Sequence, residues 1–130
     1  MVSEIDINNL VESIENSFMD NGVVFEVECV PFKEVVGEVR YFKTIKDISE
    51  CPNLFEEHQW VRIADGHTYA FVGVKQDEYK LKAFVYVTED CPMDGFEQMI
   101  VDGIKDYVWN AGIESVLYES PSCSRMPLQR

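Results

Sequence analysis

Residues 60–74 read WVRIADGHTYAFVGV, and this stretch decides the fold class. The Asp65-Gly66 pair separates two runs of strand-forming residues, and such a pair satisfies the positive φ angles of a two-residue hairpin turn. The stretch therefore predicts two antiparallel strands, 60–64 and 67–74. The turn also sets the expected cross-strand pairs, which are Ala64 with His67, Ile63 with Thr68, Val61 with Ala70 and Trp60 with Phe71.

Further strands are expected on both sides of this hairpin. Alternating apolar and polar residues predict them over 23–30, 35–45, 81–88 and 115–118. A short helix can form over residues 49–57, because proline is tolerated in a first helical turn and Pro52 lies near its start.

Two longer helices are predicted from the spacing of apolar residues. Residues 6–21 and 94–110 place apolar side chains at every third or fourth position, which is the period of an amphipathic helix. Asp6 is expected to cap the start of the first helix, and Asp94 with Glu97 to form a capping pair at the start of the second.

These elements predict an α+β fold with a largely antiparallel sheet of about five strands and both long helices packed on one face. The chain of 130 residues has the length of one domain. We expect that domain to span residues 1–120, followed by a C-terminal tail, 121–130. The face turned toward the helices should be aliphatic, with Val61, Ile63, Ala70, Val72, Val74, Ala83, Val85 and Val87.

The other face of the sheet should be mixed and aromatic. It is expected to carry Arg62, His67 and Phe84 beside a second candidate interface formed by Trp60, Tyr69, Phe71 and Tyr86. Tyrosine and tryptophan combine apolar area with a polar tip, as is common at interfaces, so this face could mediate homo-oligomer formation. The alternative is that the tail and loops simply cover it.

The net charge of −13 restricts the possible partners. Residues 1–32 hold seven acids and no Lys or Arg, and residues 89–119 hold eight acids against Lys105 alone. Residues 33–88, which contain the hairpin, are nearly neutral. Direct binding to nucleic acid or to an anionic membrane requires Lys and Arg patches, so the composition argues against both.

Because the negative charge belongs to the segments with the two helices, their outer surfaces should form one acidic wall. Trp109 falls in the polar arc of the second helix, where an exposed indole is a candidate binding hot spot or could instead fold back onto the last strand. The expected partner is a basic, nucleic-acid-binding protein, although the acids could also form only a solvated face. The expected partner-binding residues are Glu12, Glu15, Asp20, Asp94, Asp102, Asp106 and Trp109.

No sequence motif for a catalytic, metal or cofactor site is present. His58 and His67 are the only histidines, and their spacing to Cys51 and Cys91 matches no zinc pattern. Neither Cys51 nor Cys91 has a histidine in an obvious partnering position, so neither is expected to act as a nucleophile. No metal and no cofactor is therefore expected, and the chain is not expected to be an enzyme.

The sequence thus favours a non-enzymatic acidic protein that occludes a basic nucleic-acid-binding partner, as viral anti-defence inhibitors and immunity proteins do. One alternative is a small structural subunit, such as a phage head–tail joining protein. Another is a ligand-binding or enzymatic α+β domain with a pocket beside Trp60, Tyr69 and Tyr86. The N-terminus does not resemble a secretory signal and no apolar run approaches the ~18 residues of a membrane span, so a cytoplasmic location with four free cysteines is expected.

Overall fold

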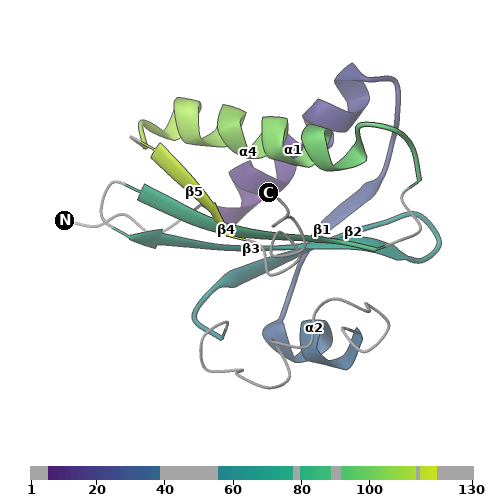
Figure 1. Ribbon diagram of the computed structural model, residues 1–130, viewed down its shortest axis with the longest axis horizontal. Coiled ribbons are helices and arrows are strands. Elements are labelled where there is room, and N and C mark those ends of the chain that lie inside the picture. Colours follow the sequence, from purple (N-terminus) through teal and green to yellow (C-terminus); the bar gives the residue numbers. More distant parts are fainter. Residues whose placement is uncertain (1–5, 39–55, 78–79, 89–91, 114, 120–130) are drawn as a thin grey trace, which may run out of the picture.

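The computed structural model describes residues 6–38, 56–77, 80–88, 92–113 and 115–119 (Figure 1). Three helices and five strands lie in these ranges. In chain order they are α1 (Ile7–Asp20), β1 (Glu26–Val30), α2 (Phe32–Glu38), β2 (Gln59–Ala64), β3 (Thr68–Asp77), β4 (Lys80–Val87), α4 (Phe96–Ala111) and β5 (Ser115–Glu119).

The strands form one sheet in the order β1-β2-β3-β4-β5. The first four strands pair antiparallel, whereas β4 and β5 are parallel and are joined through α4. Helices α1 and α4 cover one face of the sheet and α2 lies below the other (Figure 1). This architecture confirms the predicted α+β fold with two long helices on one face.

Helix α1 follows the sequence prediction closely. Asp6 is its N-cap, and the Asp6 side chain accepts a hydrogen bond from the backbone N–H of Asn9 at 3.2 Å. The apolar stripe of α1 packs against α4, where Gly103 lies directly against Ile14. Across the same contact, the buried Ser17 hydroxyl donates to the Met99 carbonyl at 2.7 Å. The two helices are therefore joined by close backbone approach as well as by apolar burial.

The start of α4 differs from the prediction. Its N-cap is Gly95, in the left-handed region at φ 79°, and no side chain caps the helix. Asp94 and Glu97 therefore do not form the expected capping pair. A glycine adopts this φ without the steric cost that a Cβ brings, so the chain enters the helix one residue later than a capping box would require.

The predicted hairpin register is wrong by two residues. Ile63 pairs with Ala70 and Trp60 with Gly73, because the connection spans Asp65 to His67 and a bulge lies between Ile63 and Ala64. The backbone N–H of Asp65 donates to the His67 carbonyl at 3.0 Å. A three-residue connection with a bulge replaces the expected two-residue turn. A slip of two residues keeps each strand's faces, so the aliphatic face is confirmed.

The bulge does change the placement of Tyr69. Tyr69 packs against the core between the sheet and the long helices, and its ring lies 6.1 Å from that of Phe25 and 6.0 Å from that of Phe96. Tyr69 was expected on the same face as Phe71, but Phe71 belongs to the cluster on the opposite face. One extra residue in a strand reverses the facing of its neighbours, which explains the error.

Residues 32–38 form a helix where the sequence predicted the start of a strand over 35–45. The carbonyl of Pro31 accepts hydrogen bonds from the N–H groups of Glu34 and Val35, which starts the helical turn. Val35 is buried in the cluster below the sheet, so tertiary packing overrides its preference for strands. The rest of that predicted strand, residues 49–55 of the predicted short helix, the tail, and Cys51, Cys91 and Cys123 lie outside the described residues.

Within the described ranges, no helix has both the length and the apolar character needed to cross a membrane.

Candidate functional site at the turn end of the sheet

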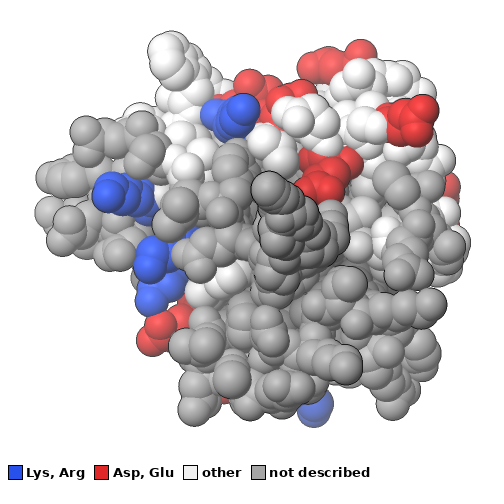
Figure 2. Space-filling view, in the orientation of Figure 1, with Lys and Arg blue, Asp and Glu red and all other residues white. Residues whose placement is uncertain are grey.

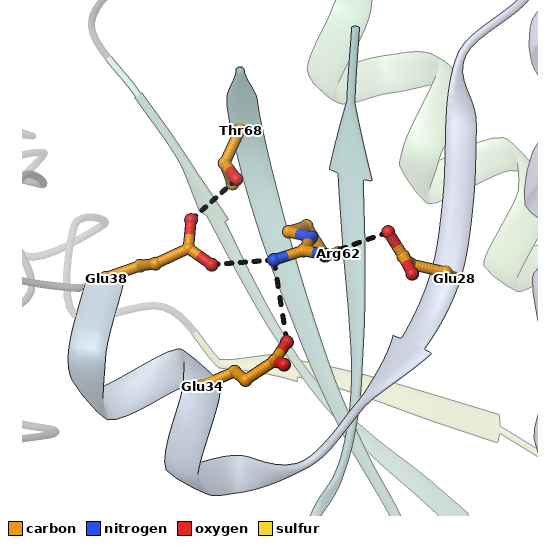
Figure 3. Close-up of polar contacts among 5 residues, drawn as sticks. All are labelled: Glu28, Glu34, Glu38, Arg62 and Thr68. Atoms are coloured by element: carbon orange, nitrogen blue, oxygen red, sulfur yellow. Dashed lines mark hydrogen bonds and ion pairs between the residues drawn. The ribbon is translucent and has the colours of Figure 1, made fainter. Parts of the chain in front are cut away.

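Arg62 on β2 is the centre of a polar network on the α2 side of the sheet (Figure 3). Its guanidinium donates to Glu38 at 2.7 Å and to Glu28 at 2.9 Å, and lies 3.5 Å from Glu34. The second carboxylate oxygen of Glu38 accepts from the Thr68 hydroxyl at 2.7 Å. The network therefore joins β1, α2 and both strands of the central hairpin.

The network carries a formal charge of −2, because one guanidinium meets three carboxylates. The hydrogen bond that Arg62 donates to Glu28 is the largest cause that raises the pKa of Arg62 above its ordinary value, and the bond to Glu38 adds to it. The Arg62 side chain is 23% exposed, whereas Glu28 and Glu34 are about half exposed. The excess negative charge thus faces solvent, where it can attract a cationic group.

On the opposite face, the same end of the sheet meets the start of α4. The rings of His67 and Tyr69 lie 4.3 Å apart, and Tyr69 in turn approaches Phe96, the first residue of α4. The backbone N–H of Thr88, just after β4, donates to the Tyr69 carbonyl at 2.9 Å. Three segments therefore converge here, namely the β2–β3 connection, the carboxyl end of β4 and the N-terminus of α4. We call this end of the sheet the turn end.

One buried polar atom at this convergence is unsatisfied. The hydroxyl oxygen of Thr88 is buried and has no hydrogen-bond partner among the described residues. An unpaired buried hydroxyl is costly, and such groups in native structures are expected to have a structural or functional explanation. Thr88 lies at the carboxyl end of a strand that pairs in parallel, which is where α/β crossover units commonly bind ligands.

The charge at the start of α4 is negative. Asp94 and Glu97 are both exposed, and no Lys or Arg occurs among residues 92–100. A helix N-terminus attracts anions through its free N–H groups, but these two carboxylates oppose that attraction. The site therefore suits an uncharged or cationic group better than a phosphate.

The expected acidic residues belong to α1, to α4 and to the residue pair just before α4, in the layer of long helices. Asp and Glu side chains gather over α1 and α4 in the upper part of Figure 2. Trp109 is 85% exposed, so it does not fold back onto the last strand. Whether these residues bind a partner stays a prediction. Glu12, Asp20, Asp94, Asp102 and Asp106 are exposed, and Glu15 is half-buried.

The second candidate interface is largely covered. Trp60, Phe71 and Tyr86 are each at most 1% exposed, and they pack with Val30 and with Val35 of α2. Tyr69 lies on the other face, as described above. The three buried rings are therefore part of a second core below the sheet, and in this conformation they offer no surface to another copy of the chain.

Among the described residues, no group of His, Cys, Asp and Glu could hold a metal ion. The ring of His58 lies 4.9 Å from that of Phe84 and 6.3 Å from that of Trp60. It belongs to the edge of the aromatic cluster.

Sequence reasoning missed Glu34, Glu38 and Thr68. The sequence feature that could have indicated two of them is the spacing of Glu34 and Glu38, because residues four apart lie on one face of a helix. Reading 35–45 as a strand hid that spacing.

No family model matches the sequence, and no curated protein matches it. Solved structures do match. A ribosomal-protein-alanine N-acetyltransferase from Brucella melitensis is 13% identical, with a TM-score of 0.53, over 75% of this chain and 81% of that chain. A glucosamine-6-phosphate N-acetyltransferase from Arabidopsis thaliana is 10% identical, with a TM-score of 0.47, over 75% of this chain and 82% of that chain. At such identities the first likeness establishes a shared fold.

This likeness corrects the functional interpretation of the sequence. The chain has the fold of an N-acetyltransferase, which contradicts the expectation of a non-enzymatic occluding inhibitor of the anti-defence or immunity type. The description as an inhibitor of the viral anti-defence type is therefore unsupported. Net charge was a poor guide because it constrains partners and solubility and does not determine the fold.

Proposed function

We propose that the chain is an enzyme of the N-acetyltransferase type, which transfers an acyl group from a thioester donor to an amine. The observation that carries the proposal is the likeness of fold to the Brucella enzyme, which covers most of both chains. The third sequence interpretation, a ligand-binding or enzymatic α+β domain, comes closest to this function, although two of the three residues beside its expected pocket, Trp60 and Tyr86, are buried.

We assign the acyl-transfer reaction to the turn end of the sheet. An amine that arrives protonated first loses one proton, which frees the nitrogen lone pair. The nitrogen then attacks the thioester carbonyl carbon, the carbon–sulfur bond breaks, the nitrogen loses a second proton and the leaving thiolate takes one up. His67 is exposed beside Tyr69, and histidine is the side chain that most often moves protons in enzymes. We assign His67 the role of proton acceptor and Tyr69 that of orienting its ring.

The Arg62 network supports a cationic acceptor. Amines are protonated at neutral pH, so an acceptor binds best where negative charge exceeds positive charge. Glu28 and Glu34 present that excess to solvent on the α2 side of the sheet, and Thr68, which bonds to Glu38, immediately follows His67 along the chain, so the network lies across the sheet from Tyr69 at the same end. The acceptor class that fits is therefore a positively charged amine.

The acids at the start of α4 disfavour an acyl donor that carries negative charge. Acetyl-coenzyme A carries phosphates, which Asp94 and Glu97 would repel. S-acetyl-N-acetylcysteamine offers the same thioester without phosphates. If the donor enters beside α4, replacing both acids by Asn and Gln should improve binding of acetyl-coenzyme A and leave binding of the short thioester unchanged.

The test is to mix the protein with each donor and with spermidine or a peptide with a free N-terminus, and to measure the acetylated amine by mass spectrometry. We expect product that depends on the protein and falls strongly in His67→Gln and Tyr69→Leu, the second of which removes the ring beside His67. Asn110→Ala, an exposed change near the far end of α4, serves as the control. Absence of both donor binding and product would overturn the proposal.

A further inference from the structure

The outer face of α4 ends in an exposed aromatic residue. Trp109 is 85% exposed and makes no ring contact with any described residue. It lies seven residues after Asp102 and three after Asp106, and both of these acids are exposed. Residues three, four and seven apart share one side of a helix, so the indole and the two carboxylates form one unpartnered face.

The charge of this face is not arranged for the stability of the helix. The negative end of the helix dipole lies at the C-terminus of α4, yet its last turn contains no basic residue and Asp106 lies one turn earlier. Neither Asp102 nor Asp106 forms an ion pair with a described residue, and Asp102 only accepts a hydrogen bond from Gln98 at 2.9 Å. A cation supplied from outside would satisfy both the carboxylates and the helix end.

The negative charge extends along α1, which begins beside this end of α4. The backbone N–H of Asp6 donates to the Tyr107 hydroxyl at 2.9 Å, so the start of α1 lies beside the last turns of α4. α1 itself has Glu12, Glu15 and Asp20 and no Lys or Arg. On α4 itself, Lys105 lies three residues after Asp102 and four before Trp109, so it shares this side of the helix and leaves it a net charge of −1. The acids of α1 add to the negative charge of the helical layer that a cationic chain would meet.

We propose that the Trp109 face, defined as Asp102, Asp106 and Trp109, docks an arginine-bearing segment of a partner protein. A guanidinium is planar and weakly hydrated, so it can stack on the indole while its N–H groups bond to a carboxylate. Lysine can supply the charge but not the stacked, forked geometry. The face is distinct from the turn end of the sheet, and this inference does not depend on the proposed acyl transfer.

The probe is a capped peptide of four Arg-Gly repeats, with otherwise identical peptides that contain lysine or citrulline in place of arginine. Citrulline keeps the shape of arginine without its charge. We expect the arginine peptide to bind most tightly, to shift the emission of Trp109, and to lose affinity as salt rises. Trp60 is buried, so the emission change should vanish in Trp109→Phe.

Two pairs of substitutions distinguish binding at the Trp109 face from attraction by the overall negative charge of the protein. Asp102→Asn with Asp106→Asn should weaken the arginine peptide about fivefold or more, as expected for lost charge-assisted contacts. Glu26→Gln with Glu56→Gln removes the same charge from exposed positions on other segments and should have little effect. Equal weakening by both pairs, equal binding of the citrulline peptide, or no binding of the arginine peptide would overturn the inference.

Discussion

The indole ring of Trp60 on β2 lies flat against the backbone of Gly73 on β3. A Cβ at position 73 would sit 2.6 Å from the ring, closer than carbon atoms approach in proteins. The contact exists because the bulge after Ile63 moves the register by two residues and sets the largest side chain opposite the smallest. It organises the aromatic cluster in which Trp60, Phe71 and Tyr86 are buried.

Gly73→Ala should therefore destabilise the protein by about 1–3 kcal/mol, the usual cost of overpacking a core. Urea unfolding followed by circular dichroism measures the change. Combining Gly73→Ala with Trp60→Leu should cost less than the sum of the two single changes, because the smaller side chain leaves room for the methyl group. Strict additivity would mean that the ring and the glycine do not constrain each other.

Gly103 plays the corresponding role between the helices. A Cβ there would meet the Cα of Ile14 at 2.7 Å, and backbone atoms cannot move aside as a flexible side chain can. We expect Gly103→Ala to destabilise by about 1–3 kcal/mol, although alanine is the better helix former by roughly 1 kcal/mol. Gly37→Ala in α2, where a Cβ meets nothing within 4 Å, is the control and should cause no loss. Equal effects at the two positions would contradict the close helix crossing.

Arg62 is expected to hold α2 on the sheet. Arg62→Met would leave Glu28, Glu34 and Glu38 facing one another without a cation, and should cost about 1–3 kcal/mol, since the network is only partly buried. Loosening of α2 should also shift the emission of Trp60 to longer wavelength, because both pack in the same cluster.

The comparison for Arg62 is Lys75→Gln, which breaks the exposed pair of Lys75 with Glu57 at 2.7 Å. Glu57 is exposed, and its pKa is lowered by the hydrogen bond and charge of Lys75, so only a slight change is expected. If Arg62→Met were as mild as Lys75→Gln, the network would not anchor α2.

Tyr107 should make the protein sensitive to high pH. Burial raises the pKa of its phenol above the ordinary value, and the charge of Asp6 adds to the rise. A group whose pKa is raised on folding stabilises the folded state at lower pH and loses that contribution as pH rises through its folded pKa. Unfolding free energy should thus fall above about pH 10. Tyr107→Phe should make this fall less steep. If the variant and the original protein had the same pH profile, Tyr107 would have the same pKa in the folded and the unfolded state.

Much of the candidate site follows from local sequence, but its assembly does not. The Asp65-Gly66 pair predicted a reversal at the correct place, and His67 and Tyr69 follow it. The bulge that turns Tyr69 toward Phe96 depends on packing across the sheet, which the turn residues do not encode. The contact of Glu38 with Arg62 joins residues 24 positions apart and requires α2 to be a helix.

The sequence by itself determined the periodic elements, namely both long helices, the cap at Asp6 and the aliphatic face of the sheet, because burial imposes a period on apolar residues that can be read directly. Tertiary structure alone decided the hairpin register, the helical state of residues 32–38 and the burial of Trp60, Phe71 and Tyr86. Each of these depends on contacts between segments far apart in the chain, where fitting a ring over a glycine or a carboxylate to a guanidinium outweighs the local preference of the residues involved.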